Sequence, residues 1–260
     1  CPYPALADRQ GRPRFLSWKK KRDTTMMKHR SGARPLPTTL ALRSLWAAAL
    51  LGASALAMAQ ANTPANNLTG TAKQGEAIAS AGLPPTVAAC ASCHGARGEG
   101  MATFPPLAGT GAGYIQAQLA AFADGSRNNA VMAPIAKGLN AQARADVAAY
   151  YASLPSGIAP VAGKASATDK GAWLVERGRM ADGIPACASC HGPGGAGVGA
   201  QFPLIAKLNA AYMQAQMDAW KSGSRGPGPL GLMEGIAKKL SNDDVSAIAQ
   251  YYASQASAKP

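Results

Sequence analysis

The sequence predicts an all-α protein built from two tandem copies of one small helical domain. Three observations predict this architecture. The stretch ACASCHG occurs twice, at residues 89–95 and 186–192. The similarity between the two copies continues beyond this stretch, to Ser153 in the first copy and Ser254 in the second. Segments with helical patterning alternate with loops rich in Gly, Pro and Ala, and no alternation of apolar and polar residues predicts a β-strand.

The matches that follow the shared stretch occur in the same order in both copies, as expected of a repeated domain. They are Phe104-Pro105 with Phe202-Pro203, residues 114–119 with 212–217, Gly125-Ser126-Arg127 with Gly223-Ser224-Arg225, the segments opening at Met132 and Met233, and Tyr150-Tyr151 with Tyr251-Tyr252. The offset between the copies drifts from 97 to 101 residues, so the four extra residues of the second copy are expected in loops.

Capping residues predict where the helices begin and end. The first helix is expected to begin at Thr71, where TAKQ matches a capping box. The middle helix is expected to end at Gly125 in the first copy and at Gly223 in the second, because glycine readily adopts the left-handed conformation that ends helices. The last helix is expected to begin at Asn140 or Ser241, both favourable N-cap residues.

The chain is expected to divide into a leader, two domains and a linker. The leader comprises residues 1–59, an upstream segment followed by a secretory signal peptide. The first domain is assigned to residues 68–154 and the second to residues 169–256. Residues 155–168 are rich in Pro, Gly, Ser and Ala without periodicity, which indicates a linker between them.

The leader is expected to direct export. Its apolar run at residues 45–59 follows a basic segment and ends in small residues. Because a membrane-spanning helix needs about 20 apolar residues, a cleaved signal peptide is favoured over a membrane anchor. Cleavage is expected near Ala59 or Ala61, translation is expected to start at Met26 or Met27, and the mature protein is expected in the periplasm.

The distribution of charge argues against nucleic-acid binding. The whole chain carries a formal charge of +13, but eleven of its 26 Lys and Arg residues and only two of its 13 Asp and Glu residues lie in the leader. The remainder therefore carries only +4, with no basic stripe interleaved with aromatic residues. No nucleic-acid partner is expected.

Four of the five cysteines belong to the two shared stretches. They are Cys90, Cys93, Cys187 and Cys190. Their number alone permits a disulfide within each stretch. A zinc site would need four ligands, and a redox-active dithiol would be expected within a βαβ pattern. Covalent attachment of haem c uses every residue of the motif, because the two thiols form thioethers and the next residue, His94 or His191, binds iron. Two covalently bound haem c groups are therefore expected.

Each haem iron also needs a sixth ligand, or an open position for chemistry. The third histidine, His29, lies in the leader. Methionine is a known axial ligand of haem iron, and only Met132 and Met233 occupy equivalent places in both copies, in expected loops before the last helix. We therefore expect Met132 and Met233 to be axial ligands. The methionines without a counterpart are expected to be packing residues: Met101, Met213 and Met217.

Residues 68–256 resemble the dihaem class I c-type cytochromes, specifically the cytochrome c4 type. The resemblance rests on CASCH at residues 90–94 and 187–191, the Phe-Pro loops, the GSR turns, and Met132 and Met233. It implies two tandem cytochrome c-like haem domains joined by a short linker and packed face to face, with their haem edges close together. It also implies a soluble periplasmic electron carrier.

The resemblance further suggests that the carbonyl groups of Pro105 and Pro203 accept a hydrogen bond from the ring of His94 or His191. Such a contact fixes the orientation of a metal-binding histidine. Plain stiffening of the loop is the alternative role for these prolines.

Three further pairs of residues recur at equivalent places in the two copies. Gly75 and Gly171 are expected to let the last helix approach the first, with Tyr151 and Tyr252 packing at the crossing. The arginines of the GSR turns match the geometry of a haem carboxylate, although a solvated turn position is the favoured interpretation.

The expected function is that of an electron carrier without catalytic residues. Its donor would be a dehydrogenase or a quinol-oxidising complex and its acceptor a terminal oxidase or reductase, and peripheral association with membrane complexes is compatible with this role. The first alternative is an electron-transfer subunit of a dehydrogenase complex. The second is a dihaem peroxidase, which would need Met132 or Met233 to be absent from the iron. The acidic residue beside one motif, Glu99, is expected to be solvated.

Overall fold

The computed structural model describes residues 68–158 and 163–257, which belong to one compact unit. These residues form helices and isolated bridges but no β-strand, so the predicted all-α class is confirmed. Within the described ranges no helix is both long and apolar enough to cross a bilayer. The leader, with its expected start and cleavage sites, lies outside the described residues.

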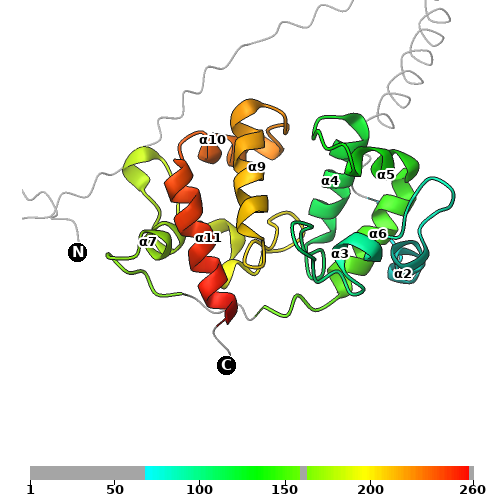
Figure 1. Cartoon of the computed structure of the whole chain (residues 1–260), viewed down its shortest axis with the longest axis horizontal. Coiled ribbons are helices and arrows are strands. Elements are labelled where there is room, and N and C mark those ends of the chain that lie inside the picture. Colours follow the sequence, from blue (N-terminus) through cyan, green and yellow to red (C-terminus); the bar gives the residue numbers. More distant parts are fainter. Residues whose placement is uncertain (1–67, 159–162, 258–260) are drawn as a thin grey trace, which may run out of the picture. The chain divides into compact units, whose positions relative to one another are not determined.

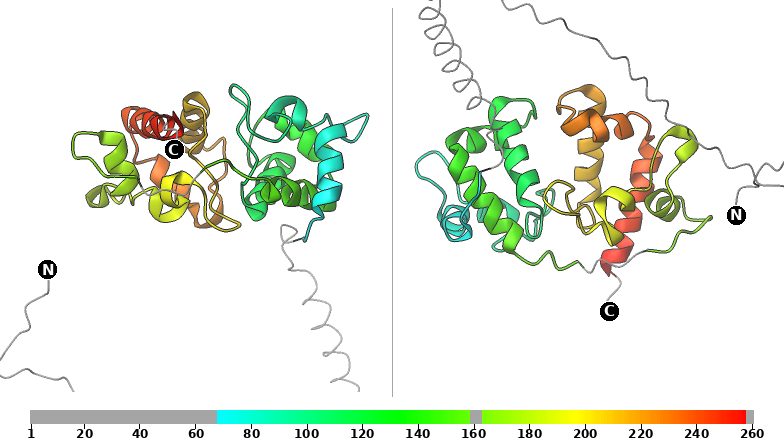
Figure 2. Two further views of the ribbon diagram at one scale, coloured as in Figure 1. Left: turned by 90° about the horizontal axis from the view of Figure 1, so that it is seen from below. Right: turned by 180° about the vertical axis from the view of Figure 1, so that it is seen from behind.

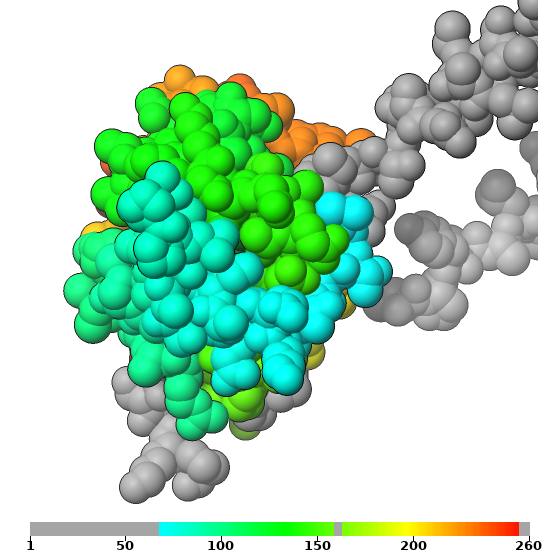
Figure 3. All heavy atoms as spheres, turned by 90° about the vertical axis from the view of Figure 1, so that its right-hand side faces the viewer, coloured from blue at the N-terminus to red at the C-terminus, as the bar shows by residue number. Residues whose placement is uncertain are grey.

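The helices of the first repeat are labelled α2 to α6 in Figure 1. They are α2 (Ala72–Ala81), α3 (Ala91–His94), α4 (Ala112–Asp124), α5 (Met132–Gly138) and α6 (Ala141–Ser153). The last helix, α6, packs against both α2 and α4, and α4 also packs against α5. Figure 3 shows residues of α2, in cyan, directly against green residues from the end of the same repeat.

The second repeat places corresponding helices in the same order. They are α7 (Lys170–Glu176), α8 (Ala188–His191), α9 (Ala210–Ser222), α10 (Leu232–Ala237) and α11 (Asn242–Ser257). Three short 3-10 turns accompany them: η1 (Met180–Asp182), η2 (Pro193–Gly195) and η3 (Pro229–Gly231). Helix α11 packs against α7 and α9, and these two contacts are visible from two sides in Figure 2.

Most of the expected helix ends are confirmed. Gly125 and Gly223 take the left-handed conformation that ends α4 and α9. The side chain of Asn140 accepts a hydrogen bond from the amide of Ala143 and caps α6. Ser241 caps α11 through the amide of Asp244, at 3.1 Å.

The capping box expected at Thr71 is wrong. Helix α2 does begin directly after Thr71, but the Thr71 side chain makes no capping hydrogen bond. Instead the amide of Thr71 donates to a carboxylate oxygen of Asp146, 2.7 Å away on α6. A tertiary contact therefore satisfies this end of the helix, and the local pattern could not reveal it.

Close packing of the first and last helices is confirmed in both repeats. The expectation that Tyr151 and Tyr252 pack at this crossing is wrong, because the preceding tyrosines, Tyr150 and Tyr251, lie there. A β-carbon on Gly75 would lie 2.8 Å from that of Tyr150, and one on Gly171 would lie 3.0 Å from that of Tyr251. The next residue of each pair, Tyr151 or Tyr252, is fully buried, and its ring lies against Gly98 or Gly195 in the loop that follows the shared stretch. Neighbouring residues of a helix point about 100° apart, so only one tyrosine of each pair can face the crossing.

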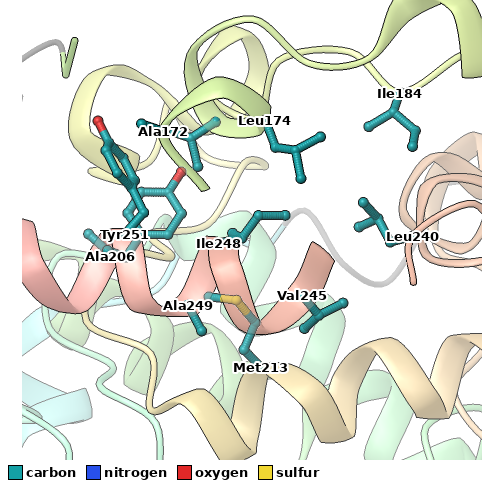
Figure 4. Close-up of a cluster of buried hydrophobic side chains, with 12 residues drawn as sticks. Ala172, Leu174, Ile184, Ala206, Met213, Leu240, Val245, Ile248, Ala249 and Tyr251 are labelled. Carbon is teal, nitrogen blue, oxygen red and sulfur yellow. The ribbon is translucent and has the colours of Figure 1, made fainter. Parts of the chain in front are cut away.

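Each repeat encloses its own hydrophobic core. The first core gathers side chains from α2, α4, α5 and α6. The second is shown in Figure 4, where Leu174, Ile184, Leu240 and Val245 approach one interior region from different segments. Met213 on α9 is 4% exposed and lies in this second core, as expected of a packing residue.

Candidate functional site

Each shared stretch forms one short helical turn that brings its reactive side chains together. In the first repeat, the amides of Cys93 and His94 both donate to the carbonyl oxygen of Cys90, at 3.2 and 2.9 Å. The second repeat repeats this geometry with the same two distances. Residues three and four positions apart lie on one face of a helix. Both thiols and the imidazole of each motif therefore border the same region.

The two histidines are oriented by proline carbonyl groups. Nδ1 of His94 lies 2.7 Å from the carbonyl oxygen of Pro105, and Nδ1 of His191 lies 2.8 Å from that of Pro203. Because a carbonyl oxygen can only accept, Nδ1 of each ring must carry the proton. The suggested hydrogen bonds are thus confirmed, and Nε2 of each ring is left with its lone pair for a metal ion.

Burial keeps these imidazoles neutral. Both histidines are 7% exposed. Burial lowers the pKa of His94 and of His191, and the hydrogen bond to the proline carbonyl offsets only part of this effect. A neutral imidazole with a fixed tautomer is the form that binds iron.

An aromatic ring lies beside each histidine and was not singled out from the sequence. The ring of Phe104 meets that of His94 edge to face at 6.1 Å, and the ring of Phe202 meets that of His191 at 6.4 Å. Each phenylalanine directly precedes the proline that orients the histidine. The recurrence of Phe-Pro in both repeats was the sequence signal for this contact.

The four thiols are unpaired, which argues against the disulfide alternative. Burial raises the pKa of the Cys187 thiol to about 11 and also raises that of Cys90. Redox-active dithiols depend on a lowered thiol pKa, which these first cysteines lack. Among the described residues no three His, Cys, Asp or Glu side chains are placed to hold a metal ion, so the zinc alternative has no support either.

The surroundings of the motifs fit a large, mostly apolar group held at the two thiols. Cys90 and Cys187 are partly buried against the cores of their own repeats. The hydroxyl oxygen of Tyr252 is buried without a hydrogen-bond partner in the described part of the chain. A buried hydroxyl left unpaired in this way is unfavourable, and a polar group within a bound cofactor would be a natural partner. The residues present therefore fit a covalently attached haem.

The two candidate methionine ligands differ from expectation in their local structure. Both were expected in loops, but Met132 is the first residue of α5 and Met233 is the second residue of α10. Both side chains are half-buried, and Met132 packs at the edge of the first core. The amide of Met132 is capped by the side chain of Asn129, at 2.8 Å, so a capping interaction starts the helix at this residue.

Two further expectations are wrong. Met101 is 49% exposed and is therefore not a packing residue. Arg127 and Arg225 are 7% and 6% exposed, so they are not solvated turn residues. Glu99 is exposed, as expected, and accepts a hydrogen bond from the amide of Arg97.

The family of the chain follows from its two repeats. Residues 72–155 and residues 169–256 each match the Cytochrome c family. The chain belongs to the Cytochrome c family. Together the two matches cover most of the described residues, so the expected tandem of cytochrome c domains is confirmed.

Two named relatives are similar over most of their length. The chain is 46% identical over 178 residues to the thiosulfate dehydrogenase electron acceptor of Thiomonas intermedia, a match that covers 67% of this chain and 82% of the relative. It is 37% identical over 167 residues to cytochrome c4 of Pseudomonas aeruginosa, covering 63% of this chain and 82% of the relative.

Two solved structures resemble the described fold. Reduced cytochrome c4 from Pseudomonas stutzeri matches with a TM-score of 0.59 and 33% identity over 70% of this chain and 97% of that protein. The thiosulfate dehydrogenase TsdBA from Marichromatium purpuratum matches with a TM-score of 0.63 and 36% identity over 72% of this chain. This chain spans only 41% of the length of the TsdBA chain.

These comparisons confirm the cytochrome c4 resemblance, the two covalent haem c groups and the electron-carrier function. The relatives are named as cytochromes or as an electron acceptor, in agreement with an electron carrier rather than an enzyme. The haem irons supply the one-electron chemistry, and the protein holds, orients and shields them.

Proposed function

We propose that this dihaem cytochrome accepts electrons from a thiosulfate dehydrogenase and passes them to a further respiratory protein. The observation that carries this proposal is the 46% identity to a thiosulfate dehydrogenase electron acceptor, which exceeds the 37% identity to a cytochrome c4. The similarity to the TsdBA structure supports the same donor. Each iron would take one electron, so one chain would carry two.

The same proposal assigns the iron ligands and the attachment points. Cys90 and Cys93 form the thioethers of the first haem, with His94 and Met132 as its axial ligands. In the second haem the thioethers come from Cys187 and Cys190 and the axial ligands are His191 and Met233. Support for the histidines comes from their buried, neutral rings and from Nδ1 atoms already engaged by proline carbonyl groups.

The proposal also includes export and the expected domain limits. The signal-like leader supports a periplasmic location, where a donor oxidising thiosulfate and a respiratory acceptor would both be accessible. The first haem domain would span residues 68–154 and the second residues 169–256, separated by the linker at residues 155–168.

A visible spectrum of the reduced, exported protein, with and without carbon monoxide, tests the ligand assignment. We expect a c-type haem spectrum that carbon monoxide does not change, because both faces of each iron are occupied. A shift of one haem on adding carbon monoxide would mean an open iron and would favour the peroxidase alternative. Absence of a haem spectrum from cells competent to attach haem would contradict both.

Stopped-flow reduction of the oxidised holoprotein tests the donor. The protein is mixed with thiosulfate and catalytic amounts of a thiosulfate dehydrogenase, and the absorbance of ferrous haem is followed. The comparison donor is a quinol-oxidising complex supplied with quinol. Rapid reduction by the thiosulfate dehydrogenase alone supports the proposal. Rapid reduction by the quinol-oxidising complex alone would favour a general cytochrome c4-type carrier.

A further inference from the structure

The segments that lead into the two proposed ligand methionines differ in length and in chemistry. Four residues, NNAV, lie between the GSR turn of the first repeat and Met132, whereas seven, GPGPLGL, lie between the GSR turn of the second repeat and Met233. The position three residues before the methionine is therefore Asn129 in the first repeat and Leu230 in the second. Only the first of these two side chains can form hydrogen bonds.

Asn129 fastens the start of α5. Its side-chain oxygen accepts hydrogen bonds from the amides of Val131 and Met132, at 3.0 and 2.8 Å. Its carbonyl oxygen accepts from the amide of Ala133, at 3.0 Å. A capping side chain of this kind stabilises the first turn of a helix. The main chain of Met132 therefore cannot move away without breaking these hydrogen bonds.

Leu230 gives the start of α10 no such support. Its main chain has φ 57°, in the left-handed region that is unfavourable for a residue with a β-carbon. The side chain is 93% exposed, so no packing contact offsets this strain. The residue before α10, Gly231, has no side chain with which to cap the helix. A movement of this segment would therefore relieve strain at Leu230 and break no side-chain cap.

The packing of the two methionines differs in the same sense. Met132 belongs to the partly buried residues that pack against the first core. Among the described residues, those that pack against the second core in this way do not include Met233. The isoleucine three positions later, Ile135 or Ile236, packs against the core in both repeats. The difference therefore lies in the segment that begins each helix and in the methionine itself.

We propose that Asn129 is a positioning residue for Met132, and that the lack of its counterpart makes Met233 the more easily displaced ligand. The second iron is then a binding site for small molecules that bind ferric iron through a nitrogen atom, and imidazole is a simple example of this class. This inference rests on the proposed assignment of both methionines as axial ligands.

The exchange is a ligand substitution without electron transfer. The bond between iron and the methionine sulfur breaks, a bond between iron and a nitrogen lone pair of imidazole forms, and the iron stays ferric. In the first repeat, withdrawal of the methionine also costs the hydrogen bonds to Asn129. In the second repeat, the same movement releases the strained conformation of Leu230. The free energy needed to open the iron is therefore higher in the first repeat.

Titration of the oxidised holoprotein with imidazole, followed by proton NMR, tests this proposal. Ferric iron shifts the signals of a bound methionine away from those of the remaining protein. The Met132→Ala and Met233→Ala variants assign each signal to its haem. In the wild type we expect the signals of Met233 to disappear at an imidazole concentration about fivefold lower than those of Met132, as expected for the effect of one capping side chain.

Three variants test the role of Asn129. Asn129→Ala should lower the imidazole concentration that displaces Met132 about fivefold, and leave the concentration that displaces Met233 unchanged. Asn129→Asp keeps an oxygen acceptor and should restore the wild-type behaviour of Met132. Asn128→Ala makes the same change at the exposed neighbouring position, and should leave both concentrations unchanged.

Leu230→Asn tests the second repeat in the opposite direction. Asparagine adopts the left-handed conformation more readily than leucine does. The variant should therefore raise the imidazole concentration that displaces Met233 several-fold, and leave that for Met132 unchanged. Because the replaced side chain is exposed, this test remains available should an Asn129 variant fail to accumulate.

Several outcomes would contradict the proposal. Displacement of both wild-type methionines at the same concentration, or of Met132 first, would overturn it. An equal change at both haems in Asn129→Ala, as expected of a general loss of stability, would also overturn it. Absence of shifted methionine signals from the untreated oxidised protein would overturn the ligand assignment together with this inference. None of these outcomes depends on which protein donates the electrons.

Discussion

The α-carbon of Gly75 lies so close to Asp146 that a β-carbon on Gly75 would be 2.0 Å from the carbonyl oxygen of Asp146. This contact joins α2 to α6, the first and last helices of the first repeat. In the second repeat, a β-carbon on Gly171 would lie 2.2 Å from the carbonyl oxygen of Ala247. A main-chain carbonyl cannot rotate away as a side chain can, so even a methyl group would force the helices apart.

Gly75→Ala is therefore expected to destabilise the first repeat by about 3 kcal/mol or more, as over-packing of a close contact does. The measurement is guanidinium-induced unfolding of the holoprotein. Gly235→Ala is the matched control, since it lies within α10 and its β-carbon would meet nothing within 4 Å. That change should be neutral or slightly stabilising, because alanine is the better helix former. Equal stability of the two variants would contradict the close contact.

Met132→Ala is expected to open the iron of the first haem. The reduced variant should bind carbon monoxide at that haem, and the potential of that haem should fall because methionine ligation raises it. Met233→Ala should do the same at the second haem only. Visible spectra with and without carbon monoxide, together with a redox titration, check both variants.

Met101→Ala serves as the control for the methionine variants. Met101 lies in the same repeat as Met132 but is 49% exposed. Its replacement should leave the spectrum unchanged and the protein insensitive to carbon monoxide. Carbon monoxide binding by Met101→Ala but not by Met132→Ala would reassign the ligand.

Asp244→Asn is expected to destabilise the second repeat in a pH-dependent way. Arg179 and Lys170 donate to the Asp244 carboxylate at 3.0 and 2.8 Å, and the amide of Ser241 donates at 3.0 Å. These hydrogen bonds, that of Arg179 foremost, hold the pKa of Asp244 well below its usual range. At neutral pH the loss should be about 2 kcal/mol, as for hydrogen bonds to a charged group.

The sign of the pH dependence follows from the lowered pKa. Asp244 stabilises the folded state fully above its unfolded pKa of about 3.9, and this stabilisation is lost as the pH falls through the lower folded value. The stability difference between wild type and Asp244→Asn should therefore be constant from pH 5 to neutrality, within about 0.5 kcal/mol, and shrink below about pH 4. Unfolding curves at several pH values measure it. Asp243→Asn, at an exposed neighbouring position, should show little effect.

The adjacent tyrosines of α11 are both expected to stabilise the holoprotein through their hydroxyl groups, but with different partners. Tyr251 donates a hydrogen bond to Glu176 at 3.0 Å, so Tyr251→Phe should cost about 1 kcal/mol. The hydroxyl of Tyr252 is buried without a partner in the described residues, and the bound haem is its expected partner, so Tyr252→Phe should cost about 1 kcal/mol as well. Thermal unfolding of both holoproteins measures these losses. Unchanged or raised stability of Tyr252→Phe would mean that the haem does not pair with this hydroxyl.

Local sequence patterns predicted much of the fold and the attachment chemistry. The spacing of Cys90, Cys93 and His94 fits one helical turn, so their shared face follows from helix geometry alone. The left-handed ends at Gly125 and Gly223 depend only on the conformational freedom of glycine. Comparing the repeats added long-range information, because a residue that recurs at the same place has the same surroundings in both copies.

The remaining features were decided by tertiary structure, because they depend on how elements distant in sequence meet. Which of Tyr150 and Tyr151 faces α2 depends on the rotation of α6, and packing of the whole repeat sets that rotation. The amide of Thr71 donates to the carboxylate of Asp146, 75 residues away, and the capping box predicted from the local sequence does not form. Arg127 looked like a solvated turn residue in isolation, but the second repeat buries it and supplies acceptors from α9. The sequence by itself determined the helices, the repeat and the haem motifs, whereas only the packing of distant segments determined which polar groups are buried and with which partners.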